Sequence, residues 1–592
     1  MTIEQRSAWL VRSLGLLLAS CWLLYIGVTN EIPADPGDGV MHFFFSQASW
    51  QDPNLFLHHW GKPFFILLSS GFAQFGFTGM IVFNVLVFMG TVWLGYKVLD
   101  HFGCHRWIQG LLPGILVLAN DYTTTIVGGL TEPLFNFSLV LALFLFIREK
   151  YLWFALLVSF MPFMRSEGQL PVLIAITLLT MKKSYKCIPL LATGFLVYAI
   201  AGVCASRNFW WFFTESPYQM GNDIYGKGNW GHYLTSYKFY LGNPGLYAVI
   251  LGTISCVILI FKKQWSTIKP LEGMLAYGVF FGVLVAHSYF WATGQNGSLG
   301  LTRIATQGMP VFVIFQLYYV DRLAGLKNSF KKFFALGTIA LFISMFTSKH
   351  FPIKAGNMER EVLQAATFLK EKTPAKYKVH YHNPLLVFAY GENPFIKGNR
   401  LIHSYFHNLS QRIDSEILPG EFVVWDSHFC PREAGLPLDT LKKYDEFVKI
   451  KEFISTESNG NPEGIILYQY IPFSKHQDSK SQTIELEPRI LSLKDRAEFK
   501  PILEHTPPQG RTFDVSVQLT ADTPDLMLVY DYDNSAIYQA NELKKGESQE
   551  FNVHWPAFGA THLYIWNPKR KKAVVRIEKV KMEEQVFHPV MQ

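Results

Sequence analysis

The chain has 592 residues, of which 49% are hydrophobic and only 17% are charged, and its formal net charge is +7. Such a low charged fraction excludes an ordinary soluble protein, in which about 25% of residues are charged. The positive charge does not predict a nucleic-acid partner, because much of the excess Lys and Arg lies in short turns between apolar segments, as in the cytoplasmic loops of membrane proteins.

Apolar segments recur through the first 350 or so residues. A helix that crosses a bilayer needs about 20 mostly apolar residues. The sequence predicts about eleven transmembrane helices, several of them short: Leu14–Thr29, Gly79–Leu99, Trp107–Ala119, Leu130–Ile147, Leu152–Met164, Leu170–Met181, Ile188–Ser206, Pro244–Phe261, Leu271–Phe290, Ile304–Val320 and Phe333–Thr347. Every second turn is basic, which predicts a cytoplasmic N-terminus. An odd number of spans then places everything after Ser348 outside the cytoplasm.

Two long outer loops are rich in aromatic residues, residues 30–78 and 207–243. Within the first, Gly39–Trp50 and Pro63–Phe75 are amphipathic rather than purely apolar. Helices of that kind lie in the plane of the membrane interface. Aromatic anchoring at the headgroup level explains the rings but not the acidic and basic residues among them.

The remainder of the chain has the composition of a soluble region. Residues 348–474 combine a helical period with strand-like runs, which predicts a small α/β domain that follows a membrane domain of residues 1–347. A polar stretch at 475–482 is typical of a linker. Short strand-like runs separated by turn residues then predict a β-sandwich over residues 483–592.

Ionisable residues gather at the outward ends of the predicted spans. Each alone is explained by an ordinary polar loop, but ionisable groups near a membrane are costly and usually face a cavity or the interface. Asp35 and Asp38 lie in the sequence DPGD, whose Pro and Gly favour a tight turn that brings both carboxylates together. The other residues of this set are His58, His59, Lys62, Glu132, Arg165, Glu167 and Arg303.

This combination suits a lipid substrate that has a phosphate headgroup and a group to transfer. Cations would stabilise the departing phosphate, with Arg suited to bidentate contacts. A carboxylate would deprotonate an acceptor hydroxyl. A paired-carboxylate turn can also hold a metal, so a divalent cation stays open, although the sequence assigns no metal ligands and no certain cofactor.

Five segments, taken in order, resemble the type-C glycosyltransferase (GT-C) superfamily, which includes the protein mannosyltransferases and the aminoarabinose and oligosaccharyl transferases. They are DPGDGVMHFF, HHWGKPFFILL, GGLTEPLFNFSLVLALFLF, FMPFMRSEGQLPVL and GSLGLTRIATQGMPVFV, and the resemblance covers about residues 10–325. Two departures stand out. Gly39 follows Asp38 where many members have a second acid, and Phe64 replaces the second Pro of the family's His-x-Pro-Pro.

The resemblance implies a membrane enzyme that transfers a sugar from a polyprenyl-phosphate donor to a glycan, lipid or protein acceptor outside the cytoplasm, with inversion. It implies that Asp38 is the catalytic carboxylate, with Asp35 the second choice. Arg165, Arg303 and Lys62 are then expected to bind the donor phosphate, and His58, His59, Glu132 and Glu167 to line the substrate cavity. We expect the plasma membrane of a bacterium, with the C-terminal domains in the periplasm.

Two other functions fit the same sequence, a transporter or flippase for a lipid-linked glycan and a non-catalytic protein of envelope-polysaccharide assembly. In the soluble part, Asp426 and His428 follow a predicted strand, where a structural role is the better expectation. His380 and His382 share a strand face but have no third ligand in the sequence, so we predict no metal site there. Core packing is the expectation for Trp555 and Trp566.

Overall fold

A computed structural model describes residues 3–205, 207–217, 226–325, 328–373, 375, 377–404, 416–418, 420–444, 447–456, 462–470, 483–494, 496, 498–505, 512–532, 538–555 and 561–585. The chain divides into two compact units. Unit 1 comprises Met1–Glu359 and Gly391–Asn399, and unit 2 comprises Arg360–Tyr390 and Arg400–Gln592. The predicted boundaries at 347/348 and 474/483 therefore stay predictions.

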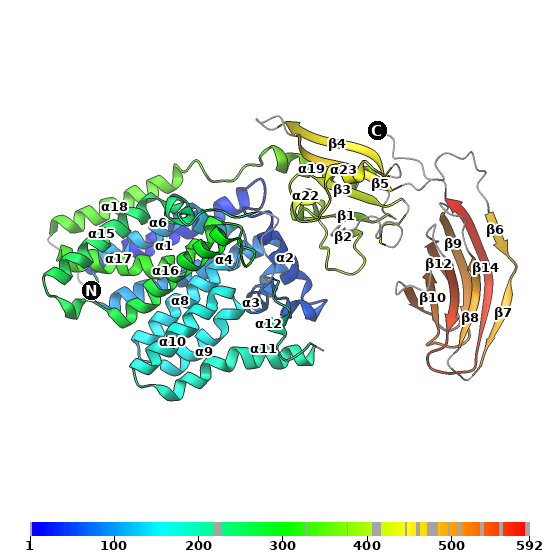
Figure 1. The fold of residues 1–592 in the computed structure, drawn as a ribbon, viewed down its shortest axis with the longest axis horizontal. Coiled ribbons are helices and arrows are strands. Elements are labelled where there is room, and N and C mark those ends of the chain that lie inside the picture. The colour runs from blue at the N-terminus through cyan, green and yellow to red at the C-terminus, as the bar shows by residue number, and fades with distance from the viewer. Residues whose placement is uncertain are drawn as a thin grey trace. The chain divides into compact units, whose positions relative to one another are not determined.

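Unit 1 is helical (Figure 1). Its elements in chain order are α1 (Ile3–Thr29), α2 (Asp38–Ala48), η1 (Pro53–Leu57), α3 (Pro63–Ala73), α4 (Gly76–His101), α5 (Arg106–Gln109), α6 (Leu111–Val117), α7 (Asn120–Val127), α8 (Glu132–Ile147), α9 (Tyr151–Phe160), η2 (Met161–Phe163), η3 (Ser166–Gly168), α10 (Gln169–Met181), η4 (Tyr185–Ala192), α11 (Thr193–Cys204), α12 (Trp211–Thr214), α13 (His232–Thr235), α14 (Tyr237–Tyr240), α15 (Gly242–Phe261), η5 (Trp265–Thr267), α16 (Pro270–Thr293), η6 (Thr302–Thr306), α17 (Met309–Ala324) and α18 (Asn328–Phe346).

Five of the described helices are long and apolar enough to cross a membrane: Trp9–Thr29, Gly76–His101, Tyr185–Cys204, Gly242–Phe261 and Pro270–Thr293. A sixth span results if Arg106–Val117 and Asn120–Val127 are counted together, although they are bent by 73°. Other predicted spans are shorter apolar helices, such as Glu132–Ile147 and Ser166–Met181. A polytopic helical region is confirmed, whereas the predicted number of eleven spans is not.

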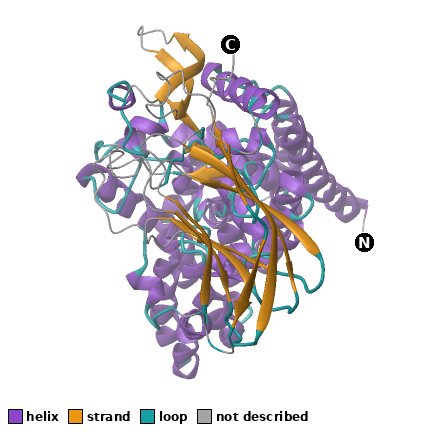
Figure 2. Ribbon diagram, turned by 90° about the vertical axis from the view of Figure 1, so that its right-hand side faces the viewer, coloured by secondary structure: helices purple, strands orange, loops and turns teal. Residues whose placement is uncertain are grey.

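Unit 2 contains three sheets, whose strands are orange in Figure 2. Helix α19 (Asn357–Lys372) begins in unit 1 and continues into unit 2. The other elements of unit 2 are β1 (Val379–Tyr381), α20 (Pro384–Tyr390), β2 (Leu401–His403), β3 (Phe422–Asp426), α22 (Phe429–Arg432), α23 (Leu438–Leu441), β4 (Phe447–Thr456), β5 (Pro462–Tyr470), β6 (Thr483–Leu486), β7 (Arg489–Leu493), β8 (Phe499–His505), β9 (Thr512–Ala521), β10 (Met527–Tyr532), β11 (Tyr538–Glu542), β12 (Ser548–Trp555), β13 (Thr561–Trp566) and β14 (Ala573–Gln585).

The first sheet has the order β2-β1-β3-β5-β4, with β1 parallel to β2 and β3 and with β5 antiparallel to its neighbours. The C-terminal strands form two antiparallel sheets, β11-β10-β13-β8 and β12-β9-β14-β6, with β7 paired to β14. Apolar side chains of both sheets, among them Val517, Leu563 and Val575, share one core. The predicted β-rich C-terminal region is confirmed.

Candidate active site at a cluster of buried charges

The DPGD turn leads directly into α2. The Asp35 side chain receives a hydrogen bond from the backbone N–H of Gly39 at 3.0 Å, and Asp38 is the first residue of the helix. A Cβ atom at position 39 would lie 1.9 Å from the carbonyl oxygen of Gly128. No side chain fits there, which explains why Gly follows Asp38 in place of a second acid. The two carboxylates of this turn are those of Asp35 and Asp38.

Arg303, in η6, joins the two aspartates. Its guanidinium donates to Asp35 Oδ2 through Nη1 and to Asp38 Oδ2 through Nη2. Burial lowers the pKa of Arg303 to about 10, so the group stays charged at neutral pH. The Asp38 side chain is 35% exposed and that of Asp35 12%. Asp38 is thus the carboxylate of the pair that solvent reaches more readily.

Arg165 lies in the loop before η3 and is held by two glutamates. Its Nη1 donates to Glu132 Oε1 at 2.8 Å and to Thr131 Oγ1 at 2.9 Å, and its Nη2 lies 3.2 Å from Glu167 Oε1. Glu132 Oε1 is also 3.9 Å from Arg303 Nε. Glu132, with a side chain 2% exposed, therefore links the two guanidinium groups.

Glu167 has two further partners that sequence reasoning missed. His287 Nε2, on α16, lies 3.2 Å from Glu167 Oε1, and Gln307 Nε2 donates to the same oxygen at 2.9 Å. Both carried a signal in the sequence. His287 is an ionisable residue inside an apolar segment, where such residues usually face the bundle interior. Gln307 belongs to the segment that contains Arg303.

Lys62 belongs to the same cluster. It is 6% exposed, has a positive φ of 64°, and donates from Nζ to Ser166 Oγ at 3.2 Å. Burial, followed by the charge of Arg165, lowers the pKa of Lys62 to about 7, while the acids Glu167, Asp38 and Glu132 act in the opposite direction. A side chain other than Gly with φ > 0 is uncommon, so the surrounding packing must fix this backbone.

His58 and His59 shape the turn that precedes Lys62. His58 stacks on Phe45 with ring centroids 3.9 Å apart, and its Nδ1 accepts from the N–H of Gly61 at 3.0 Å. His59 Nε2 donates to the carbonyl of Phe212 at 2.8 Å. Burial lowers the pKa of both imidazoles to about 4, so they are neutral at pH 7. They contribute shape rather than positive charge.

The structure thus brings together Asp35, Asp38, Lys62, Glu132, Arg165, Glu167 and Arg303, with His58 and His59 in the adjoining turn. A guanidinium group bridges the two aspartates of the turn, so their arrangement does not fit a resident divalent cation. Among the described residues, no group of three or more His, Cys, Asp and Glu is arranged to hold a metal ion.

Asp426, in unit 2, has a structural contact. Its Oδ1 accepts from the N–H groups of His428 and Phe429 at 3.0 and 2.5 Å, which fixes the turn before the short helix α22. Trp566 stacks on Phe499 with centroids 5.8 Å apart. The side chain of Trp555 lies outside the part of the chain that is described.

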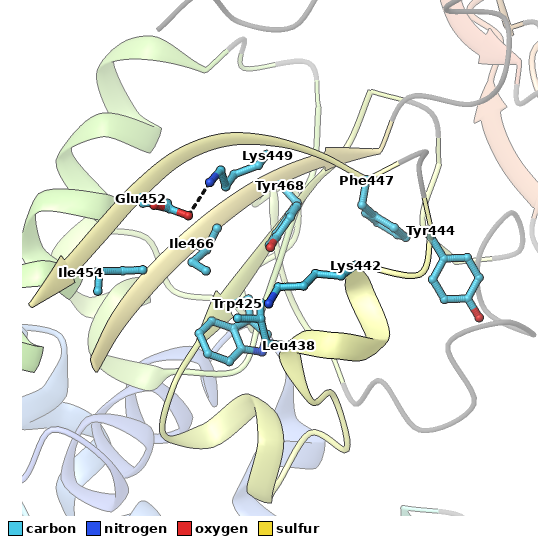
Figure 3. A pocket seen from close by; sticks show the side chains of 10 residues that line it. All are labelled: Trp425, Leu438, Lys442, Tyr444, Phe447, Lys449, Glu452, Ile454, Ile466 and Tyr468. Atoms are coloured by element: carbon cyan, nitrogen blue, oxygen red, sulfur yellow. Dashed lines mark hydrogen bonds and ion pairs between the residues drawn. The ribbon is translucent and has the colours of Figure 1, made fainter. Parts of the chain in front are cut away.

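Unit 2 also has a groove of about 390 Å³ beside β4 and β5 (Figure 3). Aromatic and charged side chains line it, among them Trp425, Tyr468, Lys442 and the ion pair of Lys449 with Glu452. None of the predicted site residues is part of this groove.

No family model matches the sequence, and no curated protein matches it. Two solved structures do. ArnT from Cupriavidus metallidurans in the apo state matches with a TM-score of 0.50 and 10% identity, over 78% of this chain and 98% of that chain. The same protein bound to undecaprenyl phosphate matches with a TM-score of 0.48 and 10% identity, over 78% and 97% of the two chains. The apo match shows that the chain has a fold like that of ArnT.

Proposed function

We propose that the chain is an integral-membrane glycosyltransferase that moves a sugar from a polyprenyl-phosphate donor to an acceptor hydroxyl. The observation that carries this proposal is the cluster around Arg165 and Arg303, in which four carboxylates and three cations meet. Within that cluster Asp38 has the most exposed carboxylate, at 35% against 14% or less for the other three. An ArnT-like fold is consistent with such chemistry.

The donor phosphate would bind to Arg165, Arg303 and Lys62. Each guanidinium is already bonded to carboxylates, so a phosphate has to exchange with one of them. The bond from Arg303 to Asp38 is the one to exchange, because Asp38 is the most exposed partner. Arrival of the donor would then release the carboxylate that the reaction needs.

The transfer is a single displacement. The oxygen of the acceptor hydroxyl bonds to the anomeric carbon of the sugar as the bond from that carbon to the phosphate oxygen breaks. The hydroxyl proton passes to Asp38, which acts as general base. Polyprenyl phosphate leaves with its new charge stabilised by the cations, and the anomeric configuration inverts. Glu132 and Glu167 hold Arg165 in place through the contacts at 2.8 and 3.2 Å.

The acceptor, in this proposal, is a glycan, lipid or protein outside the cytoplasm. The chain would lie in the bacterial plasma membrane with unit 2 on the periplasmic side. This orientation rests on the basic turns between spans.

The test is incubation of the purified protein in liposomes with a panel of polyprenyl-phosphate sugars and of acceptor hydroxyl compounds. We expect one donor to lose its sugar and to yield an equal amount of free polyprenyl phosphate. Movement of an intact donor across the bilayer, with no release of sugar, would instead assign a transporter and overturn the proposal.

A further inference from the structure

The segment Gly391–Asn399 belongs to unit 1, although its neighbours in the sequence belong to unit 2. On both sides the chain continues into unit 2, through α20 and β2, yet the segment packs as part of unit 1. Gly391 and Gly398 both have φ of +88°, the left-handed region that favours glycine, so the chain can reverse at each end. Asn399 Nδ2 closes the loop by donating to the carbonyls of Pro394 and Ile396 at 2.7 and 3.1 Å.

Asn393 fastens this loop to α2. It is 7% exposed, and its Nδ2 donates to the carbonyl of Phe44 at 3.0 Å and to Gln47 Oε1 at 2.9 Å. Its Oδ1 accepts from the N–H of Phe395 at 3.0 Å, which fixes the orientation of the amide. One buried side chain therefore joins the loop to the second half of the helix that begins at Asp38.

Phe395 extends the contact toward Lys62. Its ring lies 4.7 Å from that of Phe45, which in turn stacks on His58 at 3.9 Å. His58 accepts from the N–H of Gly61, next to the strained backbone of Lys62. The loop thus braces two walls of the cluster, α2 with Asp38 and the turn with Lys62.

We propose that residues 391–399 are a positioning strap, and that Asn393 is the residue through which it holds α2 and Asp38 in the geometry for transfer. The proposal rests on the proposed function of the cluster. Along the chain, both ends of the strap continue into unit 2.

The test uses the full chain with Asn393→Asp, which keeps the acceptor for Phe395 but loses both donors to α2. The matched control is Asn567→Asp in the β-sandwich. Asn567 also donates from Nδ2 to two carbonyls, those of Lys494 and Lys571, at 3.0 and 2.7 Å. Phe395→Ala is a second variant that removes the ring contact and leaves Asn393 unchanged.

Two readouts separate this proposal from the proposed function. In hydrogen exchange, the α2 amides of residues 43–48 should exchange about tenfold faster in Asn393→Asp and Phe395→Ala but not in Asn567→Asp. In the transfer assay, kcat should fall roughly tenfold in both strap variants with an unchanged KM for the donor. Unchanged exchange in α2 would overturn the strap whatever the activity. Absence of transfer in the wild-type chain would overturn the function and leave the exchange result valid.

Discussion

Two networks of buried polar groups can be compared in this chain, the charge cluster of unit 1 and a smaller network in unit 2. In unit 2, His380 Nε2 donates to Glu421 Oε2 at 2.8 Å, and His380 Nδ1 lies 3.0 Å from Ser404 Oγ. These three residues come from or adjoin β1, β2 and β3, which are neighbours in one sheet, and all of them are buried. In unit 1, the bonded pair of Asp35 and Arg303 is separated by 268 positions in the sequence.

The difference between them lies in access. The unit 2 network joins adjacent strands, and all three of its residues are buried. Holding these strands together is a sufficient role for its contacts. The unit 1 cluster gathers residues from distant loops and leaves Asp38 one-third exposed. Burial of polar groups alone is thus weak evidence of function, whereas an accessible carboxylate among buried cations is an arrangement that group transfer can use.

Asp38→Asn should give the largest effect, because the amide cannot accept the hydroxyl proton. We expect the rate of transfer to fall by about 10³-fold with normal insertion and folding. The assay is release of polyprenyl phosphate from a labelled donor. Asp426→Asn in unit 2 is the control and should retain activity, while full activity of Asp38→Asn would remove Asp38 from the mechanism.

Arg303→Lys should come next. Lysine keeps the charge but not the planar fork that reaches Asp35 and Asp38 together. We expect kcat/KM to fall by about 10²-fold, measured with varied donor. Arg207→Lys is a matched control, because Arg207 pairs with Glu215 at a more exposed position. Equal losses in the two variants would show that the effect is not specific to the cluster.

The effect of pH on donor binding should be smaller than the effect of Arg303→Lys. Lys62, with a pKa of about 7, is cationic below that pH and neutral above it, so its attraction for a phosphate is lost as pH rises. His58 and His59, at about 4, do not titrate in this range. We expect KM for the donor to rise roughly tenfold from pH 6 to pH 8, with a flat profile in Lys62→Arg. A wild-type profile without this rise would contradict the role of Lys62.

Glu421→Gln should leave the rate of transfer unchanged. The change weakens the bond to His380 and should destabilise the sheet of unit 2 by about 1–3 kcal/mol. Faster hydrogen exchange in β1 and β3 is the measurement. Loss of transfer in this variant, with α2 exchange unchanged, would break the comparison between the two networks.

The sequence predicted individual residues of the cluster better than it predicted which of them pair. Asp38 and Arg303 could be singled out because ionisable residues stand out beside apolar spans, and the helices lie close to the predicted segments. Their pairing could not be predicted, because it joins residues far apart in the chain. Gly39 departs from the family pattern, and the sequence alone does not explain why. The structure does, because the carbonyl oxygen of Gly128 leaves no room for a side chain at position 39.

The number of spans could not be predicted from the sequence either. Hydropathy measures composition along the chain and does not report a bend such as the 73° between Val117 and Asn120. Nor does it show whether an apolar helix as short as Glu132–Ile147 crosses a bilayer. For the same reason the strap was missed, since nothing in residues 391–399 marks a loop that packs with α2.

Photocrosslinking tests most directly whether the unit 1 cluster holds the donor. A polyprenyl phosphate with a photoreactive group beside the phosphate is bound to the full chain, irradiated and mapped by peptide mass spectrometry. We predict labelled peptides that contain Lys62, Arg165 or Arg303, with labelling reduced in Arg303→Lys. Labelling confined to unit 2, or unchanged by that substitution, would contradict the assignment of this cluster as the active site.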